Sequence, residues 1–218
     1  MIIDIHTHTT HLSDDSDLTP DDLIVAAKEA GLDGVCITEH DRFWSAEAVT
    51  RLSRSHDFPV FPGCEITTEE GHLLVYGLRE YRFGMHRTSF VRELADKAGA
   101  VVILAHPYRR THFEDMAQVD GAYEGMLKRA MSNPAMGLVD GIDVLNGRGT
   151  DAENGFSLEL AERSGLPQSG ASDAHDLKDV GSYATEFERR VGGLDDLVEE
   201  LRAGRYRPAT LNGRRPKT

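Results

Sequence analysis

Residues 1–17, MIIDIHTHTTHLSDDSD, join a short apolar run to a cluster of side chains that bind metals well. The run MIIDI is rich in isoleucine and predicts a buried β-strand. His6 and His8 follow at its end, and residues two apart on a strand point to the same side, about 6.6 Å apart. Both imidazoles can therefore reach one ion, so the segment predicts a strand that delivers two metal ligands at its carboxyl end.

Strand-like and helix-like segments alternate along the rest of the chain. Short apolar runs predict strands in GVCIT, FPVFPGCEIT, HLLVYGL, AVVILAH, VDGIDVLN and LPQSGAS. Helix boundaries carry typical capping residues, which are Thr19 and Pro20 at one start and Gly31, Gly99 and Gly165 at three ends. Six or seven strands that alternate with helices predict an α/β fold whose parallel sheet closes into a barrel, with an open doubly wound sheet as the alternative.

The composition indicates one folded domain spanning residues 1–218, with disorder expected only in the tail NGRRPKT. No apolar run approaches the roughly 20 residues that span a bilayer, and no leader peptide is evident, so we expect a cytoplasmic protein without a membrane partner. Cys36 and Cys64 lie in apolar runs and are interpreted as reduced core residues. The net charge of −13 disfavours long duplex nucleic acid, because such binding needs a basic face.

Metal-binding residue types recur where the predicted strands end. Five strands are followed by such residues, which are His6 and His8, then His40, Glu65, His106, and Asp173 with His175. In an α/β barrel the carboxyl ends of the strands meet at one rim, which carries the active site. His72 begins a strand and is a weaker candidate, whereas Asp4 and Asp41 are expected to support ligands. Imidazole and carboxylate donors suit Zn²⁺, Mn²⁺ or Fe²⁺, so the sequence predicts a metal site at this rim.

Seven motifs in order, DIHTHTT, ITEHD, GCEIT, HLLVYG, AHP, DVLNGR and SDAH, resemble those of the PHP family, named for polymerase and histidinol phosphatase. The resemblance covers the chain from residue 2 to about residue 188. It implies a distorted seven-stranded (β/α)7 barrel, similar to a TIM barrel. It also implies hydrolysis of phosphate esters with two or three divalent ions, which would be Mn, Zn or Fe.

The same resemblance implies a set of metal ligands. A first ion would be held by His6, His8, Glu65 and Asp173, a second by Glu65, His72 and His106, and a third by His40, His175 and an acid of the SDDSD loop. Counting back from LTP favours Asp15 as this acid, and counting forward from His8 favours Asp14. We prefer Asp15, and His11 is an outside candidate because some relatives use a histidine here. Catalysis is expected to rest on His6, His8, Glu65, Asp173 and His175.

Polar residues beside these motifs are candidates for substrate binding. Arg109 and Arg148 are expected to clamp a phosphate, because a guanidinium can donate two parallel hydrogen bonds. Asn146 is expected to orient the substrate or a bound water, and Arg42 and Arg110 are weaker candidates. Two or three divalent ions would keep the site positive within an acidic protein and would generate a hydroxide nucleophile at neutral pH.

The leading hypothesis is a metal-dependent phosphoesterase that acts on a small anionic phosphomonoester, a nucleotide or a short oligonucleotide. The alternatives are a histidinol-phosphatase-like enzyme, a 3′→5′ exonuclease, a non-phosphate metallohydrolase such as an amidohydrolase, and a metal-binding regulatory module. The long segment 111–136 is interpreted as an amphipathic packing helix in preference to a lid over the site.

Overall fold

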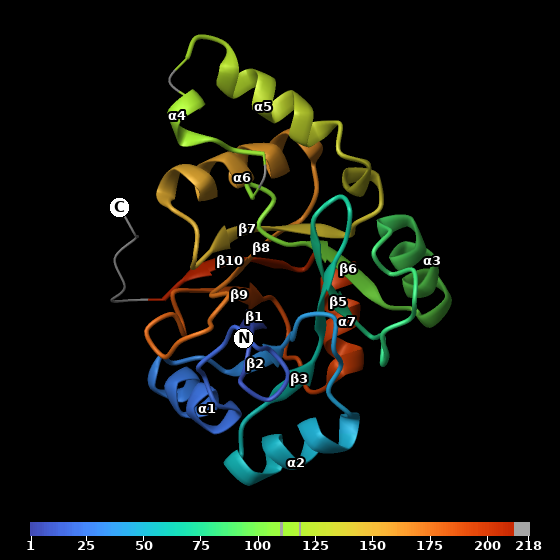
Figure 1. The fold of residues 1–218 in the computed structure, drawn as a ribbon. Helices are drawn as coiled ribbons and strands as arrows, with labels where there is room; N and C mark the ends of the chain where they lie inside the picture. Colours follow the sequence, from blue (N-terminus) through green and yellow to red (C-terminus); the bar gives the residue numbers. More distant parts are fainter. Residues whose placement is uncertain (110, 118, 212–218) are drawn as a thin grey trace.

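The computed structural model describes residues 1–109, 111–117 and 119–211, so the predictions for Arg110 and for the tail at 212–218 lie outside the described residues. Within that part of the chain, the strands form two five-stranded sheets with helices around them (Figure 1). The first sheet contains, in spatial order, β10 (Tyr206–Thr210), β9 (Tyr183–Phe187), β1 (Ile2–Thr7), β2 (Gly34–Ile37) and β3 (Val60–Pro62). The second contains β4 (Cys64–Thr67), β5 (His72–Tyr76), β6 (Val101–Leu104), β7 (Gly141–Asn146) and β8 (Gln168–Ala171).

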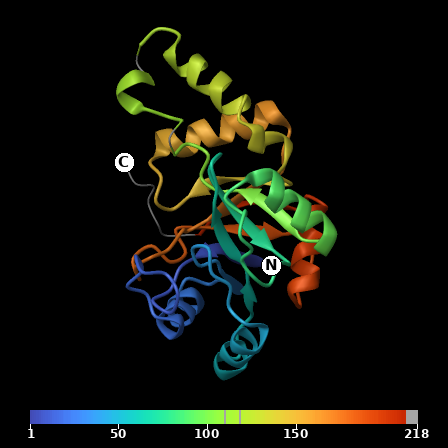
Figure 2. The same cartoon turned by 45° about the vertical axis from the view of Figure 1, so that its right-hand side comes forward.

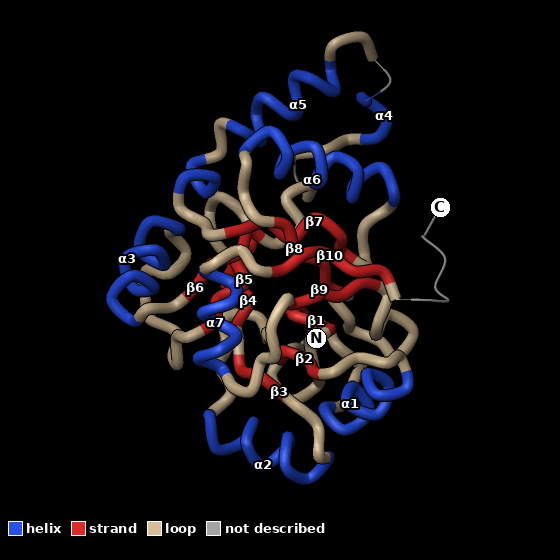
Figure 3. The backbone as a smooth tube through the Cα atoms, turned by 180° about the vertical axis from the view of Figure 1, so that it is seen from behind, coloured by secondary structure: helices blue, strands red, loops and turns tan. Residues whose placement is uncertain are grey.

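Helices lie on the outside of these strands, as the view from behind shows (Figure 3). Those in the described residues are α1 (Pro20–Glu29), α2 (Ala46–His56), α3 (Thr88–Ala98), α4 (Glu114–Ala117), α5 (Ala122–Met131), α6 (Asp151–Ser164), α7 (Leu194–Arg202) and the short 3₁₀ helix η1 (Pro134–Gly137). The Thr19 side chain caps α1 by accepting a hydrogen bond from the backbone of Asp22. Gly99 and Gly165 end α3 and α6 in the left-handed conformation, as predicted.

The prediction of a closed seven-stranded barrel is not confirmed, because the described strands form two sheets with mixed pairing. Pairing is parallel within β1-β2-β3 and β6-β7-β8, but antiparallel within β4-β5-β6 and between β9 and β10. β9 pairs antiparallel with β1 at Ile2 and Ile3, whereas the other end of β1 meets the segment after β8 through a parallel bridge between Thr7 and Ala174. The run FPVFPGCEIT divides at Gly63 into β3 and β4, where Glu65 donates a backbone hydrogen bond to the Thr38 carbonyl and joins the two sheets.

Apolar side chains from both sheets share one core. Ile3 and Ile5 of β1 lie with Ile103 of β6 in a buried cluster that Leu197 and Leu201 of α7 complete. Burying each of these side chains stabilises the fold by about 1.5–3 kcal/mol. The shared core holds the two sheets against each other, so the polar residues that follow β1 and β8 are brought to the same end.

Helix α5, within the segment predicted as a packing helix, packs on α6. Met126, Leu127 and Ala130 of α5 form a buried cluster with Tyr108 and with Phe156 of α6. Figure 2 shows α5 lying along α6 above the sheets. The preferred interpretation of this segment, an amphipathic packing helix, is confirmed for α5.

Two further expectations concern the cysteines and the membrane. Cys36 and Cys64 are buried and form no disulfide, in agreement with the prediction. Among the described residues, no helix combines the length and the apolar character needed to cross a bilayer.

Candidate metal centre

The end of β1 places two buried imidazoles side by side. The Nε2 atoms of His6 and His8 lie 3.0 Å apart, and both side chains are fully buried. Each Nε2 lies 3.2 Å from Oε2 of Glu65. Asp173 Oδ1 lies 3.5 Å from the His6 nitrogen and 3.4 Å from the His8 nitrogen. The structure therefore brings together the four residues that the resemblance assigned to a first ion.

Glu65 lies at the centre of the cluster and is shared by two further groups. Its Oε1 atom lies 2.8 Å from His72 Nδ1 and 3.0 Å from His106 Nε2. Its Oε2 atom lies 3.1 Å from His40 Nδ1 in addition to the two nitrogens from β1. The backbone N–H of Asp41 donates to the Glu65 carbonyl at 2.9 Å and fixes this strand end. One buried carboxylate thus faces five histidines from four segments of the chain.

The loop after β1 contributes a carboxylate to the outer side of the cluster. Oδ2 of Asp15 lies 3.2 Å from Nε2 of His40 and 3.2 Å from Nε2 of His175. Asp14 points away, since its side chain is 93% exposed and lies 3.8 Å from Arg42. The structure thus places Asp15, the preferred of the two acids, beside the histidines expected to hold a third ion.

His11, the outside candidate, lies apart from the cluster. Its ring packs against the indole of Trp44, with 4.4 Å between the ring centroids. That position leaves Asp15 as the residue of this loop that faces both His40 and His175.

Two of the clustered residues have backbone conformations that are uncommon for side chains other than glycine. His106 has a φ of 29° and Asp173 has a φ of 52°. Such positive φ values cost roughly 1–3 kcal/mol and persist where the surroundings impose them. Both residues follow strands, β6 and β8, and the turn of the backbone directs their side chains inward to Glu65 and to the β1 histidines.

The donor atoms are spaced as they would be around metal ions. Four groups of at least three donors lie within 4.8 Å of one another, including His8 with His40 and His175, and Glu65 with His72 and His106. Ligands that bind one ion at about 2.0–2.2 Å lie roughly 3.0–3.5 Å apart, and the nitrogens around Glu65 match that range. The Oε2 atom of Glu65 is buried and forms no hydrogen bond of ordinary geometry with these nitrogens. A cation at these positions would satisfy it.

The charges of the cluster stabilise its carboxylates in the ionised form. Burial alone would raise the pKa of Glu65, but the charge of His6 and the hydrogen bond from His106 outweigh it and hold that pKa well below its usual range. Burial also opposes the protonation of His6, yet the carboxylates of Asp173 and Glu65 raise the pKa of His6 to about 9. Burial lowers the pKa of His106 to about 4, so its imidazole is neutral and able to act as a ligand.

A buried network that the sequence did not predict supports the loop of Asp15. The Glu39 carboxylate accepts hydrogen bonds from the Thr9 backbone at 3.0 Å, the Thr9 hydroxyl at 2.5 Å, the Trp44 indole at 3.0 Å and the Ser13 hydroxyl. The Ser13 hydroxyl also lies 3.3 Å from Nδ1 of His8. Glu39 therefore ties the loop to β1 and helps to orient a candidate ligand. The signal for it was a charged residue directly after the apolar run GVCIT.

Two more carboxylates lie beneath the cluster. Burial raises the pKa of Asp4 to about 6, although its Oδ1 accepts hydrogen bonds from the backbones of Ser172 and His6. These contacts agree with the expectation that Asp4 supports the ligands. Burial raises the pKa of Asp143 to about 8, and sequence reasoning missed this residue because it lies inside the apolar run of β7. Asn146 donates to Asp143 at 3.2 Å.

The predicted substrate-binding residues take different positions around the site. Nη2 of Arg109 lies 2.9 Å from Oδ2 of Asp173, and its side chain is 36% exposed. The Asn146 side chain is buried and donates to the same Asp173 oxygen at 3.3 Å. Arg148 is exposed, and its backbone N–H donates to Oδ1 of Asn146. Arg42 donates to a loop carbonyl, away from Glu65.

Two protein-family models match this chain. The model described as PHP domain matches residues 4–163, and the model described as PHP-associated matches residues 151–206. The chain belongs to the PHP domain family. Nearly all of the clustered donors lie within the PHP match, and Asp173 and His175 lie within the PHP-associated segment. The resemblance found in the sequence motifs is confirmed.

Solved structures with the same fold include PHP-like proteins. A proposed metal-dependent phosphoesterase from Bifidobacterium adolescentis has a TM-score of 0.57 and 18% identity, over 91% of this chain and 95% of that one. A two-domain protein from Bacteroides vulgatus, containing a PHP-like metal-dependent phosphoesterase assigned by prediction, has a TM-score of 0.66 and 18% identity, over 97% and 65%. An amidohydrolase from Chromobacterium violaceum, with bound sulfate and no metal, has a TM-score of 0.57 and 16% identity, over 95% and 97%. No curated protein matches this chain. These neighbours share the fold of this chain, and the PHP family match together with the clustered donors supports a metal-dependent hydrolase.

Proposed function

We propose that this chain hydrolyses phosphate esters with two or three divalent metal ions bound around Glu65. The observation that carries the proposal is the single buried carboxylate of Glu65, which lies within 3.2 Å of imidazole nitrogens from five histidines. Such a carboxylate can bridge two ions, as the ligand set implied by the family requires. Mn, Zn and Fe all suit these nitrogen and oxygen donors.

The ligands would divide between the ions according to their contacts. His6, His8, Glu65 and Asp173 would hold a first ion, and His72 with His106 would complete a second on the other Glu65 oxygen. His40, His175 and Asp15 would hold a third. Divalent ions bound there would supply Lewis acidity and lower the pKa of water toward about 7.

The chain's own residues would position the phosphate. Arg109 already lies 2.9 Å from Asp173, with its guanidinium partly exposed at the edge of the cluster. A phosphate placed there would accept hydrogen bonds from the remaining guanidinium N–H groups. Asn146 donates to Oδ2 of Asp173, whereas His8 faces Oδ1. The Asn146 contact would therefore keep the Asp173 carboxylate in one orientation. Arg148, exposed at the end of β7, would be the second arm of the clamp.

The acidic surface agrees with a small substrate. A formal net charge of −13 opposes the approach of long duplex nucleic acid, whereas three ions with six positive charges would outweigh the three ligand carboxylates locally. A small phosphomonoester, a nucleotide or a short oligonucleotide therefore remains the substrate class that we propose.

The test is hydrolysis of a panel by protein with a measured metal content. The panel contains p-nitrophenyl phosphate, bis-p-nitrophenyl phosphate, nucleotides and, for the amidohydrolase alternative raised by the Chromobacterium violaceum neighbour, an N-acyl amino acid. The expected result is hydrolysis of a phosphate ester by metal-loaded protein, measured as inorganic phosphate from the monoesters and as p-nitrophenol from the diester. Cleavage of the amide alone, or no hydrolysis of any phosphate ester by protein that holds two or three ions, would overturn the proposal.

The proposed phosphate-binding role of Arg109 and Arg148 is tested by measuring the effects of their substitution on KM and on kcat separately. Arg148→Ala should raise KM for a phosphomonoester about tenfold or more with a smaller effect on kcat, because it removes binding rather than chemistry. Arg109→Lys keeps the charge but loses the paired donors, and it should lower kcat/KM as well. Unchanged kinetics for Arg148→Ala would remove that residue from the clamp.

A further inference from the structure

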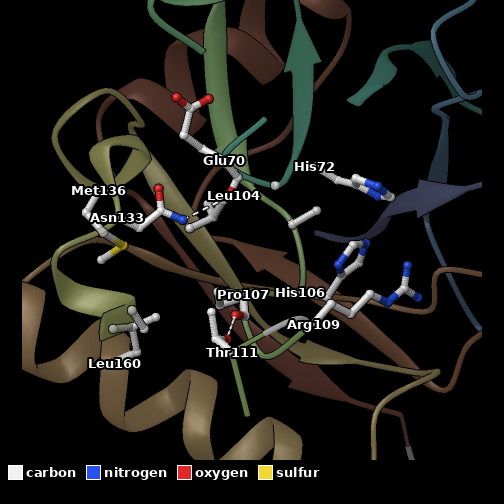
Figure 4. A pocket seen from close by; sticks show the side chains of 13 residues that line it. Glu70, His72, Leu104, His106, Pro107, Arg109, Thr111, Asn133, Met136 and Leu160 are labelled. Carbon is white, nitrogen blue, oxygen red and sulfur yellow. Dashed lines mark hydrogen bonds between the residues drawn. The ribbon is translucent and has the colours of Figure 1, made fainter. Parts of the chain in front are cut away.

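A cavity of about 160 Å³ adjoins the candidate metal centre on the side of β6 and α5. His72 and His106 line it, and both also contact the Glu65 carboxylate, at 2.8 and 3.0 Å. Figure 4 shows these histidines and Arg109 on one side, and Met136 and Leu160 on the other. The cavity thus shares one wall with the metal centre and has an apolar wall opposite.

The apolar wall is built from the packing helices and from the strand that precedes His106. Its side chains come from β6, from the segment between β6 and α4, and from α5, η1 and α6; they are Leu104, Ala105, Pro107, Ala130, Met136 and Leu160. Ala130 and Leu160 also belong to the buried cluster that holds α5 on α6. The wall is therefore fixed by the fold rather than by a free loop.

The polar side chains of this wall already have partners within the chain. Asn133 donates to the Glu70 carbonyl at 2.8 Å and caps η1 through its oxygen. The Glu70 carboxylate accepts from the Thr88 hydroxyl at 2.8 Å. The Thr111 hydroxyl donates to the Tyr108 carbonyl at 3.0 Å. A hydroxyl or charged group that entered against this wall would lose its hydrogen bonds to water and would not gain hydrogen bonds to these side chains. The wall therefore disfavours polar ligands.

The size of the cavity limits what it can hold. An apolar cavity of about 150 Å³ in another protein is known to bind benzene, so a volume near that value accepts one six-membered ring or a short branched alkyl group. A whole nucleoside, with its ring system and ribose, is larger and carries hydroxyls that this wall does not accommodate. The cavity therefore selects by both size and polarity.

We propose that this cavity receives the leaving group of the substrate, and that the chain prefers phosphomonoesters of aryl or short alkyl alcohols to those of polyols and nucleosides. The inference rests on the proposed phosphoesterase function. Arg109 lines the cavity and also contacts Asp173, so a phosphate bound to it would lie at the cavity, where its alcohol group can reach the apolar wall. Hydrolysis breaks the bond between phosphorus and that oxygen, the oxygen of water joins phosphorus, and a proton from water goes to the departing alkoxide to give the alcohol.

The activity test compares phenyl phosphate, glycerol phosphate and adenosine monophosphate with metal-loaded protein. We expect kcat/KM for phenyl phosphate to exceed that for each of the others by about tenfold or more. Phenolate is also the better leaving group, so the share of this preference that belongs to the cavity is the share lost when its apolar wall is changed. Met136→Gln should reduce this preference severalfold, because it places an amide in the apolar wall. Met136→Leu should keep the preference, and Met131→Gln, which makes the same change on α5 outside the cavity, should leave it unchanged.

A binding measurement gives a readout without turnover. Phenol, the apolar product, should shift the methyl NMR resonance of Met136 saturably in both metal-free and metal-loaded protein, and glycerol should not. Equal hydrolysis of phenyl and glycerol phosphate, or the same preference in Met136→Gln as in wild type, would overturn the cavity assignment and leave the phosphoesterase proposal standing. Absence of any phosphate release with saturable phenol binding at Met136 would refute the phosphoesterase and, with it, the leaving-group role.

Discussion

Substitution of Glu39 by glutamine tests whether the buried network behind the cluster holds the loop of Asp15. Oε1 of Glu39 accepts from the Trp44 indole, and Oε2 accepts from the Thr9 backbone. Both of these donors are N–H groups that cannot reverse their role. Whichever end of a glutamine side chain carries the amide nitrogen, it faces one of them. Glu39→Gln therefore removes at least one hydrogen bond and brings the amide N–H₂ group of glutamine against the N–H group of Trp44 or of Thr9.

The structure gives a magnitude for this loss. A hydrogen bond to a charged acceptor contributes roughly 1.5–3 kcal/mol. The favoured orientation turns the amide nitrogen toward Trp44, which is partly exposed, and leaves the buried Thr9 N–H paired. We expect the free energy of unfolding of the metal-free protein to fall by about 2 kcal/mol in urea denaturation. Because the Ser13 hydroxyl links Glu39 to His8, metal affinity should also fall by about 10–100-fold.

A double-mutant cycle separates this mechanism from a general loss of packing. In the Trp44→Phe background the competing indole donor is absent, so Glu39→Gln should cost about 1–2 kcal/mol less there than in wild type. Equal costs in the two backgrounds, or a Glu39→Gln protein as stable as wild type, would refute the argument from the two fixed donors.

Two further predictions use matched pairs of neighbouring or similar residues. Asp15→Asn should lower the number of ions bound per chain, or weaken the affinity for one ion about tenfold or more, by metal analysis. Asp14→Asn should bind metal as wild type does. The reverse result would assign the loop ligand to Asp14. Gly147→Ala should lower the free energy of unfolding by roughly 1–3 kcal/mol, because the added methyl would overlap the Ser172 carbonyl. The control is Gly155→Ala in α6, where the added methyl meets no atom within 4 Å, and it should be neutral or stabilising by up to about 1 kcal/mol. Equal denaturation midpoints for the two variants would contradict this prediction.

The residues that the structure brings together around Glu65 were expected from local patterns. The apolar run MIIDI predicts a buried strand, which the structure contains as β1, and the strand period then puts His6 and His8 on one side of it. The ends of β6 and β8 were identified in the same way, and so His106 and Asp173 were expected at the site before any contact was known.

The features that the sequence did not indicate, the β9-β10 pair and the role of Glu39, depend on contacts between distant segments. β9 and β10 are short, and neither is a continuous apolar run, since β9 contains Thr185 and Glu186 and β10 contains Arg207 and Pro208, so nothing local marks them as an antiparallel pair beside β1. There was therefore no reason in the sequence to expect β9 at that edge of β1. Glu39 was overlooked because a carboxylate in a buried run is interpretable only once its partners, Thr9 and Trp44, are seen beside it.

The choice between Asp14 and Asp15 also needed the structure. Counting from the two sides of the loop gave different residues, and the direction of each side chain is decided by the fold of the loop. The contacts of Asp15 with His40 and His175 come from segments 25 and 160 residues away.

Metal-dependent hydrolysis of phosphate esters around Glu65 is tested most directly by the rate of phosphate release, measured against the number of divalent ions bound per chain. Protein stripped by a chelator is titrated with Mn²⁺, Zn²⁺ or Fe²⁺, and phosphomonoester hydrolysis is followed in wild type and in Glu65→Gln. We expect no activity without metal, a rise that is complete at two or three ions per wild-type chain, and little activity in Glu65→Gln at any occupancy. Full activity in metal-free protein, or a wild-type chain that binds two or three ions and releases no phosphate, would contradict this expectation.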